Sequence, residues 1–258
     1  MKSFLVAFPV LASLFLVAKA DVVEIPTTSF NSYTDLEKYW NYLYPWGSDH
    51  NGAARMVGSS TDHSHISVSN GVLTLKATPT TGQPPSTANP KPAINYLSGT
   101  IYAKDQITVD GTNAKGYTVS GEFIAPTAKG TWPAFWLTAV HGWPPEADIG
   151  EWKGTAQTWF NTFNTSSAVH STIVDWPTDG KFHSVSATLR TVAGSTTDLS
   201  IAYSLDGVHK ATDIALNFRG AAMYLIIDLQ MEGSSGSPGP TGTTTFQARN
   251  VQVTKLTS

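Results

Sequence analysis

The sequence predicts an all-β protein in which two antiparallel sheets pack as a sandwich or jelly roll. From Tyr96 onward, short apolar or alternating segments follow one another closely, as they do in β-sandwiches. Turn signals such as Asp110-Gly111 and Asp206-Gly207 separate these segments, and none of them shows a ten-residue helical period. The predicted strands lie at 98–103, 105–109, 116–125, 131–138, 146–152, 157–164, 181–191, 197–205, 222–231 and 244–255.

The region before Tyr96 contains fewer strand signals. Ser69-Asn70-Gly71 predicts a hairpin turn within residues 64–77. Residues 34–44 suit either a short helix or an irregular connection. Residues 78–93 form a proline-rich loop, and loops of this length in a compact domain often border a site.

Residues 1–20 have the three parts of a secretory signal peptide. Lys2 is basic, residues 4–17 are apolar, and residues 18–20 follow the small-x-small rule of a cleavage site. The apolar run is too short for a convincing membrane span, and no other stretch could cross a bilayer. We therefore expect a secreted, extracellular protein whose single β-jelly-roll domain occupies residues 21–258.

Charge and cysteine content exclude several classes of function. The formal net charge of the 258 residues is −3, and it becomes −5 when Lys2 and Lys19 leave with the signal, which contains no acid. A mildly acidic chain with scattered lysines is a poor partner for nucleic acids or anionic membranes, and we expect a monomer. The chain has no cysteine, so disulfides and thiolate chemistry are excluded. Residues 164–166 form a glycosylation sequon, which is compatible with secretion and makes a glycoprotein conceivable.

The segment 143–152 carries the strongest chemical signal, because Glu146, Asp148 and Glu151 lie within six residues of a chain that is 14% charged. On a strand, Glu146 and Asp148 project from one face, whereas plain alternation sends Glu151 to the other. A bulge at 149–150 would return Glu151 to their face. Three carboxylates in one row cost free energy unless they share protons or hydrogen bonds, which suggests a reactive site. The alternative is an exposed edge where the acids face water.

Tryptophans accompany these carboxylates. All eight lie between Trp40 and Trp176, and their faces can bury the apolar side of a pyranose ring. Trp132 and Trp136 share one face of the predicted strand 131–138, and we expect them in the groove. Trp152 alternates with Glu151, so we expect it in the core. The seven histidines lack metal-ligand spacing.

With these pieces in order, the chain resembles the family 16 glycoside hydrolases of the β-glucanase and laminarinase type over about residues 96–255. The specific pieces are Gly130-Thr131-Trp132-Pro133-Ala134-Phe135-Trp136-Leu137 and Glu146-x-Asp148-x-x-Glu151. The resemblance implies a concanavalin A-like β-jelly roll with a concave sheet that binds sugar. It also implies retaining, endo-acting hydrolysis of a β-linked polysaccharide without a cofactor, and it makes a structural calcium ion on the convex side plausible.

The same resemblance implies roles for residues. Glu146 would be the nucleophile, Glu151 the general acid/base, and Asp148 would hold a proton and tune Glu146. Retaining chemistry needs the two glutamate carboxyls about 5–5.5 Å apart, and their repulsion is expected to favour the protonated form of the acid. The expected substrate-binding residues are Trp132, Trp136, Asn161 and Gln230.

The chain departs from the family at two places. Ala147 replaces a bulkier aliphatic residue, and Asn161 or Asn164 stands where many members carry a histidine. A second polar row, formed by Asp228, Gln230 and Glu232, is expected to face the cleft. These departures leave β-1,3-glucan, mixed-linkage glucan and β-1,3-galactan open as substrates.

Two other functions fit the fold. A polysaccharide lyase of the glucuronan or alginate type would need a base and a group that neutralises the uronate, and no spacing singles out its candidates. Those candidates are His50, His65, Tyr96, Tyr117, Tyr203, Gln230 and Lys153. The acidic motif would also repel a polyuronate. A non-catalytic lectin is the third possibility, although a lectin has no need of converging acids.

Overall fold

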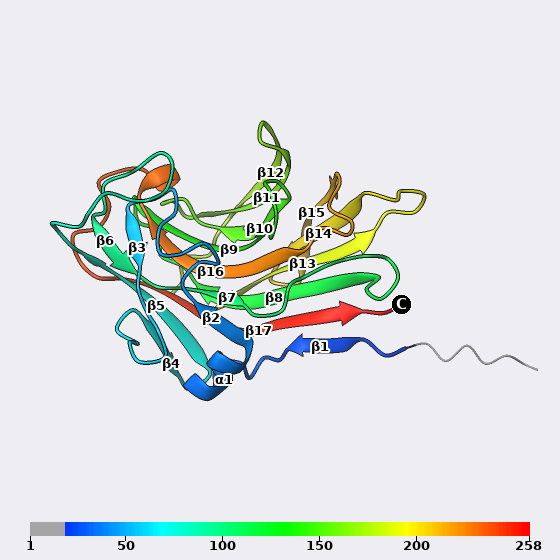
Figure 1. Cartoon of the computed structure of the whole chain (residues 1–258), viewed down its shortest axis with the longest axis horizontal. Helices are drawn as coiled ribbons and strands as arrows, with labels where there is room; N and C mark the ends of the chain where they lie inside the picture. The colour runs from blue at the N-terminus through cyan, green and yellow to red at the C-terminus, as the bar shows by residue number, and fades with distance from the viewer. Residues whose placement is uncertain (1–18) are drawn as a thin grey trace, which may run out of the picture.

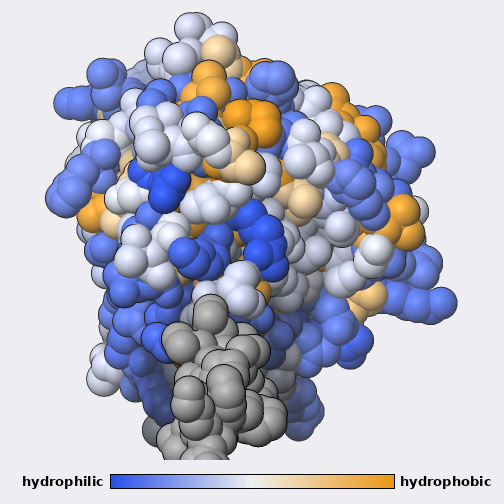
Figure 2. All heavy atoms as spheres, turned by 90° about the vertical axis from the view of Figure 1, so that its right-hand side faces the viewer, coloured by the Kyte–Doolittle hydropathy of each residue, from blue (hydrophilic) through white to orange (hydrophobic). Residues whose placement is uncertain are grey.

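The computed structural model describes residues 19–258. The expected signal peptide at 1–20 lies outside the described residues, apart from its last two. Figure 1 shows two stacked layers of strands, with β9, β10 and β11 in one layer and β8, β17 and β5 in the other. Within residues 19–258, no helix combines the length and the apolarity that crossing a membrane requires. On the face seen in Figure 2, hydrophilic residues predominate and hydrophobic ones form small scattered groups.

The first layer is a seven-stranded sheet that carries the site described below. Its strands, in spatial order, are β12 (Ala168–Asp175), β11 (Gln157–Thr165), β10 (Glu146–Glu151), β9 (Thr131–Ala139), β16 (Met223–Met231), β7 (Thr100–Ala103) and β2 (Trp40–Tyr42).

The second layer is a ten-stranded sheet. Its spatial order is β15 (Val208–Ala215), β14 (Leu199–Leu205), β13 (His183–Thr191), β8 (Gly116–Ile124), β17 (Thr244–Leu256), β5 (Val72–Pro79), β6 (Tyr96–Ser98) and β3 (Ala54–Met56), with β1 (Val22–Ile25) on β17 and β4 (Ile66–Ser69) on β5. Among the described strands, β3 and β6 pair in parallel and the other pairings are antiparallel. The predicted jelly-roll sandwich is confirmed.

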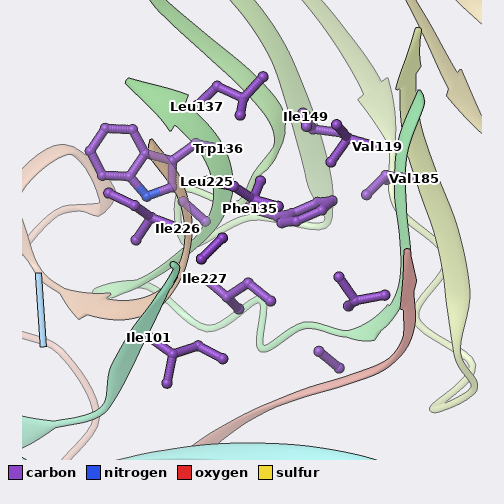
Figure 3. Packing of buried hydrophobic residues seen from close by; sticks show 14 of the residues in the cluster. Ile101, Val119, Phe135, Trp136, Leu137, Ile149, Val185, Leu225, Ile226 and Ile227 are labelled. Carbon is purple, nitrogen blue, oxygen red and sulfur yellow. The ribbon is translucent and has the colours of Figure 1, made fainter. Parts of the chain in front are cut away.

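The core lies between the two layers because alternate residues of each strand point inward. Figure 3 shows Val119 and Val185 of the ten-stranded sheet facing Phe135 and Ile149 of the seven-stranded sheet. Phe123 extends the contact, since its ring lies 5.0 Å from that of Phe135 between centroids.

Trp152 is fully buried in this core, as predicted. Its ring packs edge-on against Trp176 at 4.9 Å. A buried indole removes a large apolar area from water, so Trp152 stabilises the packing of β10 against the opposite sheet.

The 34–44 region resolves into a short helix, α1 (Tyr33–Tyr39), followed directly by β2. The Ser32 side chain caps the helix by accepting a hydrogen bond from the Asp35 backbone N–H at 3.0 Å. Leu36 is its buried residue, and the chain becomes extended at Trp40. The predicted hairpin also forms, between β4 and β5.

Other strand predictions were wrong or missing. Residues 105–109 form no strand, because Ile107 makes only an isolated bridge to Met223. The strands β12 and β15 were missed. Each lies at the outer edge of its sheet and is exposed over most of its length, so it lacks the buried–exposed alternation from which strands are recognised.

Candidate active site

A cleft of about 900 Å³ lies on the concave side of the seven-stranded sheet. Strands β9, β10 and β16 contribute Trp132, Trp136, Glu146, Asp148, Glu151, Asp228 and Gln230 to its lining. Loops around residues 46–51, 87–89 and 140–143 form its walls. The cleft therefore brings together the predicted residues of three separate strands.

The predicted bulge on β10 is present and decides the direction of Glu151. Along β9, the partners of Asp148 and Glu151 are Trp136 and Ala134, and along β11 they are Asn161 and Trp159. Three steps on β10 thus oppose two on each neighbour, which places Glu151 on the face of Asp148. Gly150 permits the close approach, since a Cβ there would lie 2.8 Å from the Trp152 ring.

The Glu151 carboxylate is buried and receives three donors. Oε1 accepts from Trp132 Nε1 at 2.7 Å, and Oε2 accepts from Asn161 Nδ2 at 2.7 Å. Lys153 Nζ lies 2.9 Å from Oε2. Two neutral donors and one cation suit an ionised carboxylate, because that form accepts and does not donate.

Asp148 lies buried between the two glutamates along the strand. Burial raises the pKa of its carboxyl well above the usual value, and the Glu151 and Glu146 carboxylates raise it further. Asn161 Nδ2 donates to Asp148 Oδ2 at 2.7 Å as well as to Glu151. The pKa direction supports the proton-holding role expected of Asp148, which stays a prediction.

A residue of the cleft wall holds Glu146 by a hydrogen bond. Trp143 Nε1 donates to Glu146 Oε2 at 2.8 Å. Burial raises the pKa of Glu146 to about 7, with the Glu151 carboxylate adding to the rise, while the Trp143 hydrogen bond and the Lys153 charge oppose it. A nucleophile must be ionised, so these two opposing contacts favour the form of Glu146 that can attack.

Asn161 and Asn164 have different partners and lie in different places. Asn161 is buried behind the acids and does not itself line the cleft. Its Oδ1 accepts from Ser171 Oγ of β12 at 2.7 Å, which orients the amide donor toward the two acids. Asn164 is bonded to backbone atoms of Ile214 and Leu216, away from the cleft. Asn161 therefore serves the carboxylates by positioning them, and a contact with sugar stays a prediction.

The second polar row is only partly in the cleft. Asp228 accepts from Tyr44 Oη at 2.8 Å and from Trp136 Nε1 at 2.9 Å, and burial raises its pKa to about 7. Gln230 lines the cleft, but its amide bonds to both backbone groups of Ala54. Glu232 follows the end of β16 with φ = 57°. The expectation that it faces the cleft was wrong, because its carboxylate instead bonds to Asn95 and Gly239 of neighbouring loops.

The tryptophans of the cleft differ in accessibility. Trp136 is 5% exposed, whereas Trp46 is 45% and Trp143 is 47% exposed. The Trp46 ring stacks on Tyr44 at 5.1 Å with an interplanar angle of 6°. Sequence reasoning assigned no role to Trp46 and considered Lys153 only for a lyase, because neither lies on a predicted strand face shared with the acids.

The proline-rich loop forms part of the wall, and a buried carboxylate clamps it. Asp49 accepts from the Arg55 guanidinium through two bonds of 2.8 Å, and from the Thr87 backbone N–H at 2.8 Å. The Arg55 hydrogen bond holds the pKa of Asp49 well below its usual range. Thr87, Ala88 and Asn89 are thereby fixed along the cleft.

Among residues 19–258, no group of three or more histidine, cysteine, aspartate or glutamate side chains is placed to hold a metal ion. The expected calcium site thus gains no ligand set within this part of the chain. His65 instead bonds to Ser64 and Thr78.

Comparison with known proteins places this site in context. No protein-family model matches the chain. The chain is 60% identical over 233 residues to a galactan endo-β-1,3-galactanase of Flammulina velutipes, covering 90% of this chain and 89% of that protein. It is 28% identical over 185 residues to an endo-1,3-1,4-β-glycanase of Rhizobium meliloti (strain 1021), covering 67% of this chain and 35% of that protein.

Solved structures share the fold. An endo-1,3-β-glucanase from Streptomyces sioyaensis matches with a TM-score of 0.69 at 21% identity, over 96% of this chain and all of that one. A non-specific endo-β-1,3(4)-glucanase from family GH16 matches with a TM-score of 0.66 at 18% identity, over 84% of each chain. Together with the galactanase likeness along nine-tenths of the sequence, these matches show that the chain belongs to glycoside hydrolase family 16 and is an endo-acting hydrolase of β-linked polysaccharides.

Proposed function

We propose that the protein is a secreted endo-β-1,3-galactanase that cleaves by retaining double displacement. The observation that carries the mechanism is the bulge of β10, which sets Glu146, Asp148 and Glu151 on one face of the cleft. The 60% identity to a galactan endo-β-1,3-galactanase supports galactan as the substrate.

In the first step, the Glu146 carboxylate attacks the anomeric carbon while the bond from that carbon to the bridging oxygen breaks. The departing oxygen takes a proton from Glu151, and a glycosyl-enzyme ester remains on Glu146. In the second step, water attacks the anomeric carbon, gives its proton to Glu151 and releases the Glu146 carboxylate. Asp148 would supply a neutral, proton-bearing neighbour that limits repulsion between the two glutamates.

The charges of the cleft favour a neutral substrate. Glu146, Asp148, Glu151 and Asp228 line it, and within residues 19–258 Lys153 is the one lysine or arginine among the lining residues. A polyuronate would meet more carboxylates than cations, so the cleft opposes lyase chemistry on such a chain. The hydrolase family membership likewise sets aside the lyase and the lectin.

The test is cleavage by the purified chain of β-1,3-galactan, β-1,3-glucan, mixed-linkage β-glucan and a polyuronate. We expect galactan to release a ladder of oligosaccharides, whose first-formed reducing ends carry the β-anomer in proton NMR spectra. Preferred cleavage of a glucan would contradict the galactan proposal, and α-anomers formed first would contradict double displacement. A product absorbing near 235 nm would indicate a lyase.

Secretion is tested separately by expressing the full chain in a secreting host. We expect the protein in the medium, with an amino terminus at Asp21. Retention inside the cells with residues 1–20 intact would contradict this part of the proposal. Sedimentation of the secreted protein checks the expected monomer.

A further inference from the structure

Lys153 is held rigidly beside the expected general acid/base. Its Nζ lies 2.9 Å from Glu151 Oε2 and 4.5 Å from the centroid of the Trp159 ring. The side chain is only 21% exposed. Gly154 follows with φ = 65°, and a Cβ there would lie 2.8 Å from the Ser235 carbonyl oxygen. The tight turn therefore fixes where the lysine side chain begins, and Trp159 fixes where it ends.

Several carboxylates surround Glu151, and the Lys153 ammonium group is the cation beside it. Glu146 and Asp148 share the strand with Glu151, and Asp228 on β16 also acts on it electrostatically. The flanking strands β9 and β11 contain no titratable residue, and among the described residues the wall of the cleft adds His50 and Asp49, whose carboxylate is paired with Arg55. The other two donors to Glu151, Trp132 and Asn161, are neutral. Lys153 is thus the positive charge that balances the carboxylates around Glu151.

We propose that Lys153 is a positioning residue that favours the ionised form of Glu151 in the second half of the reaction. The proposal rests on the roles given above to Glu146 and Glu151. Glu151 must be protonated when the leaving sugar departs, but ionised when it accepts the proton of the attacking water. A fixed ammonium group 2.9 Å away stabilises the ionised form of Glu151 and disfavours its protonated form.

The two halves of the reaction should consequently respond in opposite ways to Lys153→Met. Breakdown of the glycosyl-enzyme should slow, because the general base is less often ionised. Formation of the glycosyl-enzyme from a polysaccharide should continue to higher pH, because the general acid keeps its proton longer. A residue that merely stabilised the fold would slow both halves together.

The experiment uses a 2,4-dinitrophenyl glycoside of the disaccharide released from the preferred polysaccharide, since this leaving group departs without acid assistance. For Lys153→Met we expect kcat at about pH 6 to fall about 10-fold and the acidic limb of kcat to move up by about one pH unit. The value of kcat/KM should be compared at about pH 8, where Glu146 is ionised with or without the Lys153 charge, and it should stay within about 2-fold there. Mass spectrometry should then detect the glycosyl-enzyme. Sodium azide should restore kcat and yield the β-glycosyl azide, because azide attacks without a general base.

Three further variants control the result. Lys153→Arg keeps the charge and should resemble the wild type. Lys210→Met should do so too, because it removes an exposed lysine of β15 that does not line the cleft. Trp159→Leu removes the ring under the ammonium and should shift kcat in the same direction by a smaller amount, so it serves if Lys153→Met does not fold.

Equal losses of kcat and kcat/KM in Lys153→Met, with no effect of azide, would overturn the proposal. That outcome differs from a failure of the proposed function. If Glu151 is not the acid/base, Glu151→Gln stays active on the polysaccharide. If only the role of Lys153 is wrong, Glu151→Gln is inactive on the polysaccharide and is rescued by azide on the dinitrophenyl glycoside, whereas Lys153→Met behaves like the wild type.

Discussion

The two faces of β10 are held by different kinds of contact. Toward the core, Ala147, Ile149 and the following Trp152 are fully buried among apolar side chains. Toward the cleft, Glu146, Asp148 and Glu151 each accept hydrogen bonds from indole, amide or ammonium groups. The core face is stabilised by burial, whereas the cleft face keeps charged groups close together at a cost that those donors offset. Changes to the two faces should therefore affect stability and catalysis separately.

The largest expected effect is on the cleft face. Glu146→Gln and Glu151→Gln keep the size of each side chain but remove the proposed nucleophile or the proposed acid/base. We expect kcat/KM on the polysaccharide to fall about 10³-fold or more, with the thermal midpoint unchanged or higher. Steady-state kinetics and circular dichroism measure the two quantities. A variant that retains full activity would remove that glutamate from the mechanism.

Trp152→Ala tests the opposite face. It removes a fully buried ring packed on Trp176 and Phe123, and the loss should be about 3–5 kcal/mol in the free energy of unfolding. The molecules that stay folded should keep kcat, because the ring does not reach the cleft. Denaturant unfolding monitored beside activity measures both. A large loss of kcat at full folding would show that the two faces are coupled more tightly than the contacts indicate.

Gly150→Ala should affect the core face and the cleft face of β10 together. The added methyl group would meet the Trp152 ring at 2.8 Å, so the bulge must shift to make room. We expect a loss of about 1–3 kcal/mol in stability, together with a fall in kcat, because moving the bulge also moves Glu151. The exposed Gly180, with open space around it, supplies the matched control as Gly180→Asn, a residue that tolerates positive φ.

The pH dependence of kcat/KM sharpens the description of the cleft face. Burial raises the pKa of Glu146 to about 7, so the proposed nucleophile is protonated below this value, and kcat/KM should rise as the pH approaches 7. Trp143→Phe removes the hydrogen bond that opposes this rise in pKa. The acidic limb should then move up by about half a unit to one unit. An unmoved limb would mean that another group controls it.

The smallest effect is expected at His183, beyond the edge of the core face, and it concerns stability alone. Trp152 packs on Trp176, which contacts His183, and His183 bonds to Asp179 and Asp206. The two carboxylates raise the pKa of His183 against its partial burial. The interaction of protonated His183 with these carboxylates therefore stabilises the fold fully below the unfolded-state pKa of histidine, about 6.5. This stabilisation is lost as the pH rises through the higher pKa that His183 has in the folded protein. Unfolding of His183→Gln at about pH 5.5 and 8.5 should differ from the wild type by less than about 1 kcal/mol, and only at the lower pH.

The sequence alone predicted the parts of the molecule that depend on local patterns. Alternation placed most strands, Gly150 marked the bulge, and Trp152 fell in the core because it follows Glu151 on the opposite face. Two positions escaped prediction for different reasons. Tyr44 meets Asp228 across 184 residues of chain, and no local period could have indicated that contact. Lys153 is only two residues from Glu151, but it lies beyond the predicted strand 146–152, in a turn that packs on Ser235.

The choice between Asn161 and Asn164 shows the same limit. The two residues are three apart on one strand, so strict alternation puts them on opposite faces but does not say which face is the cleft. The pairing of Asn161 with Asp148 settles their directions. The seven-residue helix α1 was likewise ambiguous, because it is too short for a clear helical period and depends on its cap and on the burial of Leu36.

Asp49 ties the proline-rich loop to the wall of the cleft by bonds that acid does not break. Because the pKa of Asp49 is held so low, its bonds to Arg55 and Thr87 survive conditions in which ordinary carboxylates have taken up protons. Glu146 on the floor changes its protonation near neutrality, because burial raises its pKa to about 7, while the proline-rich rim of the cleft keeps its place. Acidification should therefore silence this enzyme long before it deforms the space into which a glycan chain fits, and neutralisation should restore activity without refolding.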